Sequence, residues 1–157
     1  MIKQFTTLIV FLSFSFLSFG QSVTQTDSIL IMSKVKAVFH AFNNPVFAEF
    51  KNLSTEKIYC IICFNSNEVS NRTNLIERTK FFKSYLRKIR QSESFKRAIS
   101  SNTIYLVKDK DYRTEITVLF TIYKKDELAP VHEGGQLGMH FRKVNNVYKF
   151  AGVETIP

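Results

Sequence analysis

The chain of 157 residues is basic, with 22 Lys and Arg, 13 Asp and Glu, and a formal net charge of +9. Its length and its aromatic content suit one globular domain with its own core. It has no phosphate-binding glycine loop, nucleophile elbow or metal-ligand motif, which excludes the function classes that such motifs identify. The positive charge would suit an anionic membrane surface, a polyanion or an acidic partner, although we interpret it mainly as a solvated surface.

The first 20 residues have the parts of a secretory signal peptide. Lys3 is followed by an apolar run over 5–19, and the small residues Ser18 and Gly20 precede the polar Gln21. The run is diluted by serines and threonines and is shorter than the roughly 20 apolar residues of a membrane span. The sequence therefore predicts a signal peptide over 1–20, export to the periplasm or the exterior, and a single mature domain over 21–157 without a transmembrane segment.

Two helices are predicted at the start of the mature domain. Asp27 is expected to cap a helix over 29–42, because apolar residues recur there at three- and four-residue spacing: Ile31, Val35, Val38 and Phe42. The residues "NNP" at 43–45 end this helix. Pro45 suits the first turn of a second, short helix over 46–53.

A strand is predicted over 56–64, and it contains Cys60 and Cys63. The run "EKIYCIICF" is rich in β-branched and aromatic residues, which is typical of a strand. Positions three apart on a strand point to opposite faces, so we expect two buried free cysteines and not a disulfide. A redox pair or half of a zinc site is the alternative.

A long helix is predicted over 74–90, with an apolar stripe of Leu75, Phe82, Leu86 and Ile89, and "QSES" at 91–94 is expected to break it. Between 78 and 97 there are eight Arg and Lys against one acidic residue, Glu93. We interpret these cations as the solvated face of a core helix. The alternative is a basic patch that contacts an anionic membrane or a polyanion.

Strands are predicted over the rest of the chain, at 103–109, 113–125, 135–144 and 147–156, with hairpin turns at 109–111 and 145–146. In the long strand, one face is apolar and the other is mixed; the mixed face consists of Glu115, Thr117, Leu119, Thr121 and Tyr123. Together these elements predict one α+β domain, with a curved antiparallel sheet packed on the N-terminal helices and one long helix.

Candidate site residues follow from the strand over 135–144. Gln136, Gly138, His140 and Arg142 share one face, and Leu137, Met139 and Phe141 share the other. If the first face lines a pocket, His140 and Arg142 form a basic wall suited to an anionic ligand; if it faces water, they are ordinary surface residues. We take four residues as ligand-binding candidates: His140, Arg142, Tyr123 and Glu115. Glu115 and Glu154 are the strand carboxylates available for acid–base catalysis.

Two other histidines are given structural or solvent roles. His40 lies off the apolar stripe of the first helix and is expected at the surface. His132 and Glu133 are adjacent and precede Gly134 and Gly135, which indicate a turn or bulge and not an acid–base pair.

The stretch "SILIMSKVKAVFHAF" and the ending "GGQLGMHFRKVNNVYKFAGVETI" resemble the NTF2-like superfamily, as in an exported bacterial member. The first resembles the first of its paired helices, and the second resembles its penultimate strand, tight turn and final strand. The resemblance implies a cone-shaped fold in which a curved sheet and helices enclose a pocket. One departure is the single strand expected between the second and third helices, where many members have a hairpin. Members include isomerases, hydrolases, dehydratases, transport factors and binding domains, so the resemblance implies a fold and not an activity.

The sequence favours an exported domain of unknown role that binds a ligand or a protein without catalysis. The alternative is a small enzyme of isomerase or hydrolase type that uses His140 as general acid or base. A small anionic ligand, a protein partner and a homodimer are the partners considered, and neither a cofactor, a metal nor nucleic acid is expected.

Overall fold

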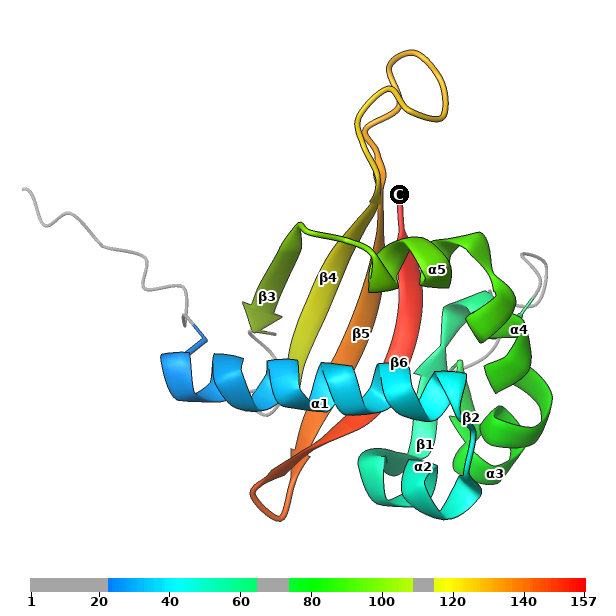
Figure 1. Cartoon of the computed structure of the whole chain (residues 1–157), viewed down its shortest axis with the longest axis vertical. Coiled ribbons are helices and arrows are strands. Elements are labelled where there is room, and N and C mark those ends of the chain that lie inside the picture. The colour runs from blue at the N-terminus through cyan, green and yellow to red at the C-terminus, as the bar shows by residue number, and fades with distance from the viewer. Residues whose placement is uncertain (1–22, 65–73, 109–114) are drawn as a thin grey trace, which may run out of the picture.

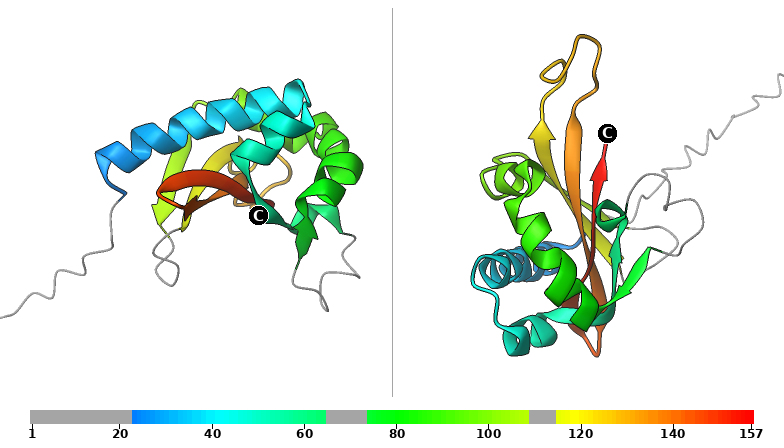
Figure 2. Two further views of the ribbon diagram at one scale, coloured as in Figure 1. Left: turned by 90° about the horizontal axis from the view of Figure 1, so that it is seen from below. Right: turned by 90° about the vertical axis from the view of Figure 1, so that its right-hand side faces the viewer.

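The computed structural model describes residues 23–64, 74–108 and 115–157. Their backbone forms one six-stranded sheet in the order β2-β1-β6-β5-β4-β3, in which β1 and β6 are parallel and all other neighbours are antiparallel. The helices cover one face of this curved sheet, and α1 crosses its strands (Figures 1 and 2). We call the opposite face, which none of the described helices covers, the outer face.

Helix α1 (Gln25–Asn43) buries the predicted apolar stripe, which includes Ile31, Val35, Val38 and Phe42. The prediction that Asp27 caps it is wrong, because the cap is Thr24, whose hydroxyl accepts the Asp27 N–H at 3.1 Å. Asp27 lies in the first turn, and its carboxylate accepts a hydrogen bond from the Tyr148 hydroxyl at 2.9 Å. The second helix, α2 (Phe47–Leu53), is confirmed.

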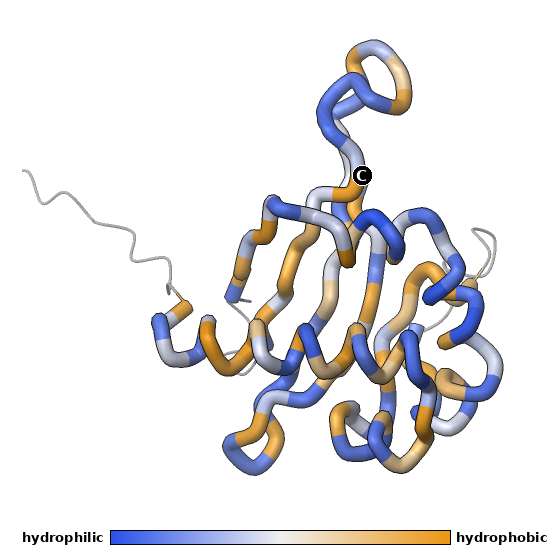
Figure 3. The backbone as a smooth tube through the Cα atoms, viewed as in Figure 1, coloured by the Kyte–Doolittle hydropathy of each residue, from blue (hydrophilic) through white to orange (hydrophobic). Residues whose placement is uncertain are grey.

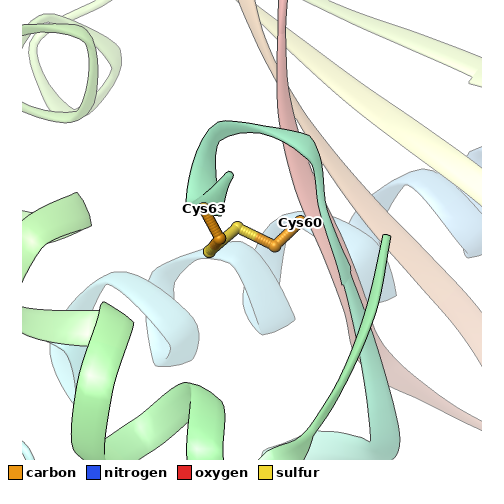
Figure 4. Close-up of a disulfide and its surroundings, with 2 residues drawn as sticks. All are labelled: Cys60 and Cys63. Atoms are coloured by element: carbon orange, nitrogen blue, oxygen red, sulfur yellow. A yellow bond between two sulfur atoms is a disulfide. The ribbon is translucent and has the colours of Figure 1, made fainter. Parts of the chain in front are cut away.

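Strand β1 (Ser54–Cys60) is shorter than predicted, and the prediction of free cysteines is wrong. The chain leaves the strand at Cys60 and makes a 3₁₀ turn over Ile61–Cys63, so the alternation of a strand no longer applies. The turn brings the two Cα atoms to 5.4 Å, and the cysteines form a disulfide (Figure 4).

A second strand, β2 (Leu75–Glu77), pairs with β1. The prediction of a helix from residue 74 is therefore wrong at its start, and Leu75 is not part of the helical stripe but points to the outer face. The sequence predicted a single strand between the second and third helices, whereas the structure has an antiparallel pair of strands there. The residues 65–73 that connect the two strands lie outside the described residues.

A helical segment, which we call helix 78–91, follows directly. It comprises α3 (Arg78–Lys80), a π-helical stretch (Phe81–Tyr85) and α4 (Leu86–Gln91). The expected break is confirmed, because Ser92 is extended and its hydroxyl caps α5 (Glu93–Ile99) by accepting the Phe95 N–H.

The four C-terminal strands are confirmed: β3 (Ile104–Lys108), β4 (Glu115–Tyr123), β5 (Gly135–Val144) and β6 (Val147–Ile156). Asn145 and Asn146 make the β5–β6 turn with φ of 49° and 62°, as expected of asparagine in a tight hairpin. The turn predicted at 109–111 lies outside the described residues.

The core between the helices and the sheet is filled by aromatic rings. Seven Phe side chains are almost completely buried there: Phe42, Phe50, Phe81, Phe95, Phe120, Phe141 and Phe150. Phe42 alone packs against four of the others, with ring centroids 5.1–6.2 Å apart. The α+β class and the curved, mostly antiparallel sheet packed on helices are confirmed, and aromatic rings occupy the space between the two layers, where the resemblance implied a pocket.

Among the residues that the structure describes, no helix is both long enough and apolar enough to span a lipid bilayer.

Candidate binding site on the outer face of the sheet

The outer face of the sheet carries a polar centre. In β4 and β5, every second residue points toward the helices and is buried: Ile116, Val118, Phe120, Leu137, Met139 and Phe141. The residues between them therefore point to the outer face. His140 lies there with Thr117 of β4 beside it on one side and Gly152 of β6 on the other. The pairing of strands thus brings together Tyr59, Thr117, His140 and Glu154, which we call the outer-face cluster.

His140 is held between a hydroxyl and a carboxylate. Its Nδ1 shares a hydrogen bond of 2.9 Å with Thr117 Oγ1, and its Nε2 lies 3.1 Å from Glu154 Oε1. The second contact is close enough for an ion pair, but the carboxylate oxygen lies off the direction of a hydrogen bond to the ring nitrogen. Both side chains are largely withdrawn from solvent, at 18% exposure for His140 and 21% for Glu154.

Two strand glycines make this packing possible. A Cβ at Gly152 would lie 2.8 Å from the Tyr59 Cβ and carbonyl oxygen, so only glycine lets β1 approach β6 so closely here. The Tyr59 ring can then pack edge-on against His140, with centroids 5.5 Å apart. At Gly138, a Cβ would lie 3.2 Å from Glu154 Cγ, so the missing side chain leaves room for the Glu154 side chain.

Tyr59 extends the cluster toward β2. Its hydroxyl lies 3.5 Å from Glu154 Oε2, at the outer limit of a hydrogen bond. Burial raises the pKa of the Tyr59 phenol, and the nearby Glu154 charge raises it further, so the phenol stays protonated as a donor. Asn74 lies beside this hydroxyl; it is buried, and within the part of the chain that the structure describes its Oδ1 has no hydrogen-bond partner.

Arg142 and Glu115 form an ion pair of their own one step along the same face. They are directly paired residues of β5 and β4, and Arg142 Nε donates to Glu115 Oε1 at 2.6 Å. Arg142, which the sequence suggested as a contact for an anionic ligand, therefore has its positive charge compensated by Glu115.

Tyr123 does not join the other predicted residues. It ends β4, roughly 20 Å from Thr117 at about 3.3 Å per residue, and the Arg97 guanidinium lies 4.5 Å from its ring centroid. Tyr123 lines two small cavities of about 280 and 310 Å³ near the β4–β5 loop. A further depression of about 680 Å³ lies nearby and includes Arg97, which is paired with Glu93 and Glu127.

The remaining histidines have the roles expected from the sequence. His40 is exposed on α1. His132 lies in the β4–β5 turn, where its Nδ1 accepts the Gly134 N–H at 2.9 Å. Over the described residues, no group of three or more His, Cys, Asp or Glu side chains is arranged to hold a metal ion.

Apolar side chains border the outer-face cluster. Leu75 of β2 lies on one side, and Tyr105 and Val107 of the edge strand β3 lie on the other. Each of the three is about half exposed. A few polar groups placed among apolar side chains are the composition of many ligand-binding sites.

The chemistry available to the outer-face cluster is hydrogen bonding and proton exchange. Thr117, His140 and Glu154 follow one another as hydroxyl, imidazole and carboxylate, which are the groups of a nucleophilic triad. However, Thr117 lies in the middle of β4, which is hydrogen-bonded to strands on both sides. The backbone N–H groups next to Thr117 are hydrogen-bonded within the sheet, so they are not available to stabilise an oxyanion. The arrangement therefore favours binding over acyl transfer.

The sequence identified His140 and Glu154 but did not connect them with Thr117 and Tyr59. Alternation along one strand assigns a face, whereas the cluster depends on the register between four strands. Gly138 and Gly152 were the available signal, because glycine inside a strand often marks a close approach of another backbone or side chain.

No protein-family model matches the chain, and no curated protein gives a significant match. Among solved structures, the chain is similar to a DUF4783 family protein from Bacteroides fragilis YCH46, with 17% identity over 76% of this chain and 93% of that one and a TM-score of 0.41. It is also similar to a designed NTF2-like protein, Rd1NTF2_05, with 12% identity over 85% of this chain and 100% of that one and a TM-score of 0.42. We infer no activity from these distant likenesses; the fold assignment rests on the element order and strand pairing of the chain itself.

Proposed function

We propose that this protein is an exported, non-catalytic binding domain whose recognition surface is the outer face of the sheet. The observation that carries the proposal is the outer-face cluster itself. Its His140 and Glu154 side chains are about four-fifths buried on a face that none of the described helices covers, and they are flanked by exposed Leu75, Tyr105 and Val107.

The groups that the surface offers favour a ligand or protein segment that supplies hydrogen-bond donors. Glu154 presents a carboxylate whose Oε2 lies 3.5 Å from the Tyr59 hydroxyl, at the outer limit of a hydrogen bond, so it can still accept a shorter one. A hydroxyl or amine group placed beside this carboxylate would donate a charge-assisted hydrogen bond to it. An anionic ligand is less well supported, because Glu115 already compensates the charge of Arg142.

Export is part of the proposal. The predicted signal peptide over 1–20 supports it, and so does the Cys60–Cys63 disulfide, because disulfides persist mainly in oxidising compartments.

A second candidate function is acid–base catalysis by His140. The contact of 3.1 Å between its Nε2 and the Glu154 carboxylate favours it, because an imidazole beside a carboxylate is a pair of groups that general acid–base catalysis uses.

One screen separates the two functions. A library of polyols, amines and amino acids, together with ester and ketosteroid substrates, is tested for thermal stabilisation and for turnover on the wild type, His140→Ala and Glu154→Gln. We expect amine or hydroxyl compounds to raise the melting temperature of the wild type and not of the variants, without turnover, since a ligand stabilises only the state it binds.

His40→Ala is the matched control, since it removes an exposed histidine from the helical side. Turnover that His140→Ala abolishes and His40→Ala preserves would establish the enzyme instead. Stabilisation that persists in both outer-face variants would place binding elsewhere.

A further inference from the structure

We propose that helix 78–91, together with the start of α2, docks on an anionic lipid bilayer surface. This interaction is separate from the outer-face cluster, since helix 78–91 belongs to the helix layer on the other side of the sheet (Figure 2). The proposal rests on unpaired cations, on exposed apolar groups beside them, and on the absence of acidic residues along this helical segment.

The cations of helix 78–91 form an exposed stripe. Lys80, Lys83 and Arg87 recur at helical spacing and are all exposed, and Lys88 is exposed beside them. Between residues 78 and 91 the sequence contains no Asp or Glu. The buried side of the same segment, with Phe81, Leu86 and Ile89, packs into the core, so the cations are held on a rigid support.

These four cations are not engaged within the protein. Among the described residues, none of Lys80, Lys83, Arg87 and Lys88 takes part in an ion pair or side-chain hydrogen bond. Arg78 and Arg90 differ, since each donates to backbone carbonyl groups of neighbouring elements. Arg97 in α5 also differs, because it forms ion pairs with Glu93 and Glu127. The positive charge of the stripe is therefore not compensated by a carboxylate of the described residues.

Apolar side chains lie next to the stripe at the start of α2. Val46 is 48% exposed and Phe47 is 38% exposed. The Phe47 ring contacts Phe82 edge-on, with centroids 5.2 Å apart, and Phe82 immediately precedes Lys83. Figure 3 shows orange, hydrophobic positions in α2 and blue, hydrophilic positions in α4.

This combination favours a bilayer over a soluble polyanion. A polyanion needs only the cations, whereas a bilayer surface attracts cations to its headgroups and also takes up exposed aromatic and aliphatic side chains at the boundary of its apolar region. Val46 and Phe47 supply the second contribution beside the first.

The test is cosedimentation of the purified exported protein with vesicles of phosphatidylcholine, alone or mixed with phosphatidylglycerol. We expect binding only to the anionic vesicles, and weaker binding at high salt because surface charges are screened. Lys83→Glu with Arg87→Glu should lower the partition coefficient by more than about tenfold. Val46→Ser with Phe47→Ser should lower it as well, and circular dichroism checks that each variant is folded.

Lys124→Glu with Lys125→Glu is the matched control, because it makes the same change in net charge on the exposed β4–β5 hairpin. Equal losses in this control would show that only net charge matters and would overturn the proposal. Absence of vesicle binding would overturn it too. Heparin binding that depends on Lys83 and Arg87, with no effect of Val46 and Phe47 on vesicle binding, would indicate a polyanion partner instead.

Discussion

Reduction of the Cys60–Cys63 disulfide is expected to lower the free energy of unfolding by about 2 kcal/mol. The bond closes a loop of only four residues, for which the loop-closure model gives an entropy loss in the unfolded chain of about 6 cal/mol/K, or about 2 kcal/mol at 25 °C. After reduction, we expect the two thiols to stay close together in the folded state, because Cys60 is completely buried and pairs with Val153 of β6.

Urea unfolding with and without a phosphine reductant measures this difference. The control is Cys60→Ala with Cys63→Ala, whose stability should be lower than that of the oxidised wild type and insensitive to the reductant. An unfolded, unreduced chain should show no reactive thiol. Two reactive thiols per chain, the full cysteine content, would refute the disulfide and the turn geometry behind it. A reductant effect near zero would refute the loop-entropy argument.

Three further predictions concern the core and the sheet. Tyr148→Phe should lower the free energy of unfolding by about 1 kcal/mol at neutral pH. It should also remove a tyrosine that titrates above the ordinary range by ultraviolet absorbance, because burial and the Asp27 carboxylate raise the pKa of Tyr148 to about 12. The raised pKa means that this stabilisation is complete below about pH 10 and is lost as the pH rises through 12; an unchanged titration curve in the variant would contradict it. Phe42→Ala should cost about 3–5 kcal/mol in urea unfolding, whereas the partly exposed Phe47→Ala should cost much less, and equal costs would contradict the proposed core. Gly152→Ala should destabilise by about 1–3 kcal/mol, since its Cβ would lie 2.8 Å from the β1 backbone; a neutral result would contradict the close β1–β6 approach.

The sequence predicted the regular C-terminal half of the fold well, for a physical reason. Strands β4, β5 and β6 are long, β4 alternates clearly, and Asn145 and Asn146 mark a turn whose positive φ few other residues tolerate. In the same way, the recurring apolar residues of α1 predicted its buried face, because helical periodicity is a local property.

The errors fall where a local pattern is short or interrupted. Strand β2 has three residues, and its Leu75 fits a helical stripe as well as it fits a strand. The run around Cys60 continues to look like a strand through Cys63, although the chain turns there, and the disulfide depends on that turn. Thr24 and Asp27 both suit a helix start, and only the structure shows that the earlier residue is the cap.

The candidate site could be predicted only in part. Alternation placed His140 and Arg142 on one face, but the pairing of Arg142 with Glu115 and of His140 with Thr117 depends on strand register. Contact with Tyr59 depends further on a parallel pair between β1 and β6, residues nearly a hundred positions apart, and on a register shift in β6 next to Gly152.

The most direct test of the outer face as the recognition surface is an amide chemical-shift map of the protein with a ligand or partner from the screen. The account predicts that the largest changes occur at Tyr59, Thr117, His140 and Glu154 and extend to Tyr105, and that Glu154→Gln weakens binding about tenfold or more. Changes confined to the helices or to the cavities around Tyr123, with the outer-face amides unmoved, would contradict it.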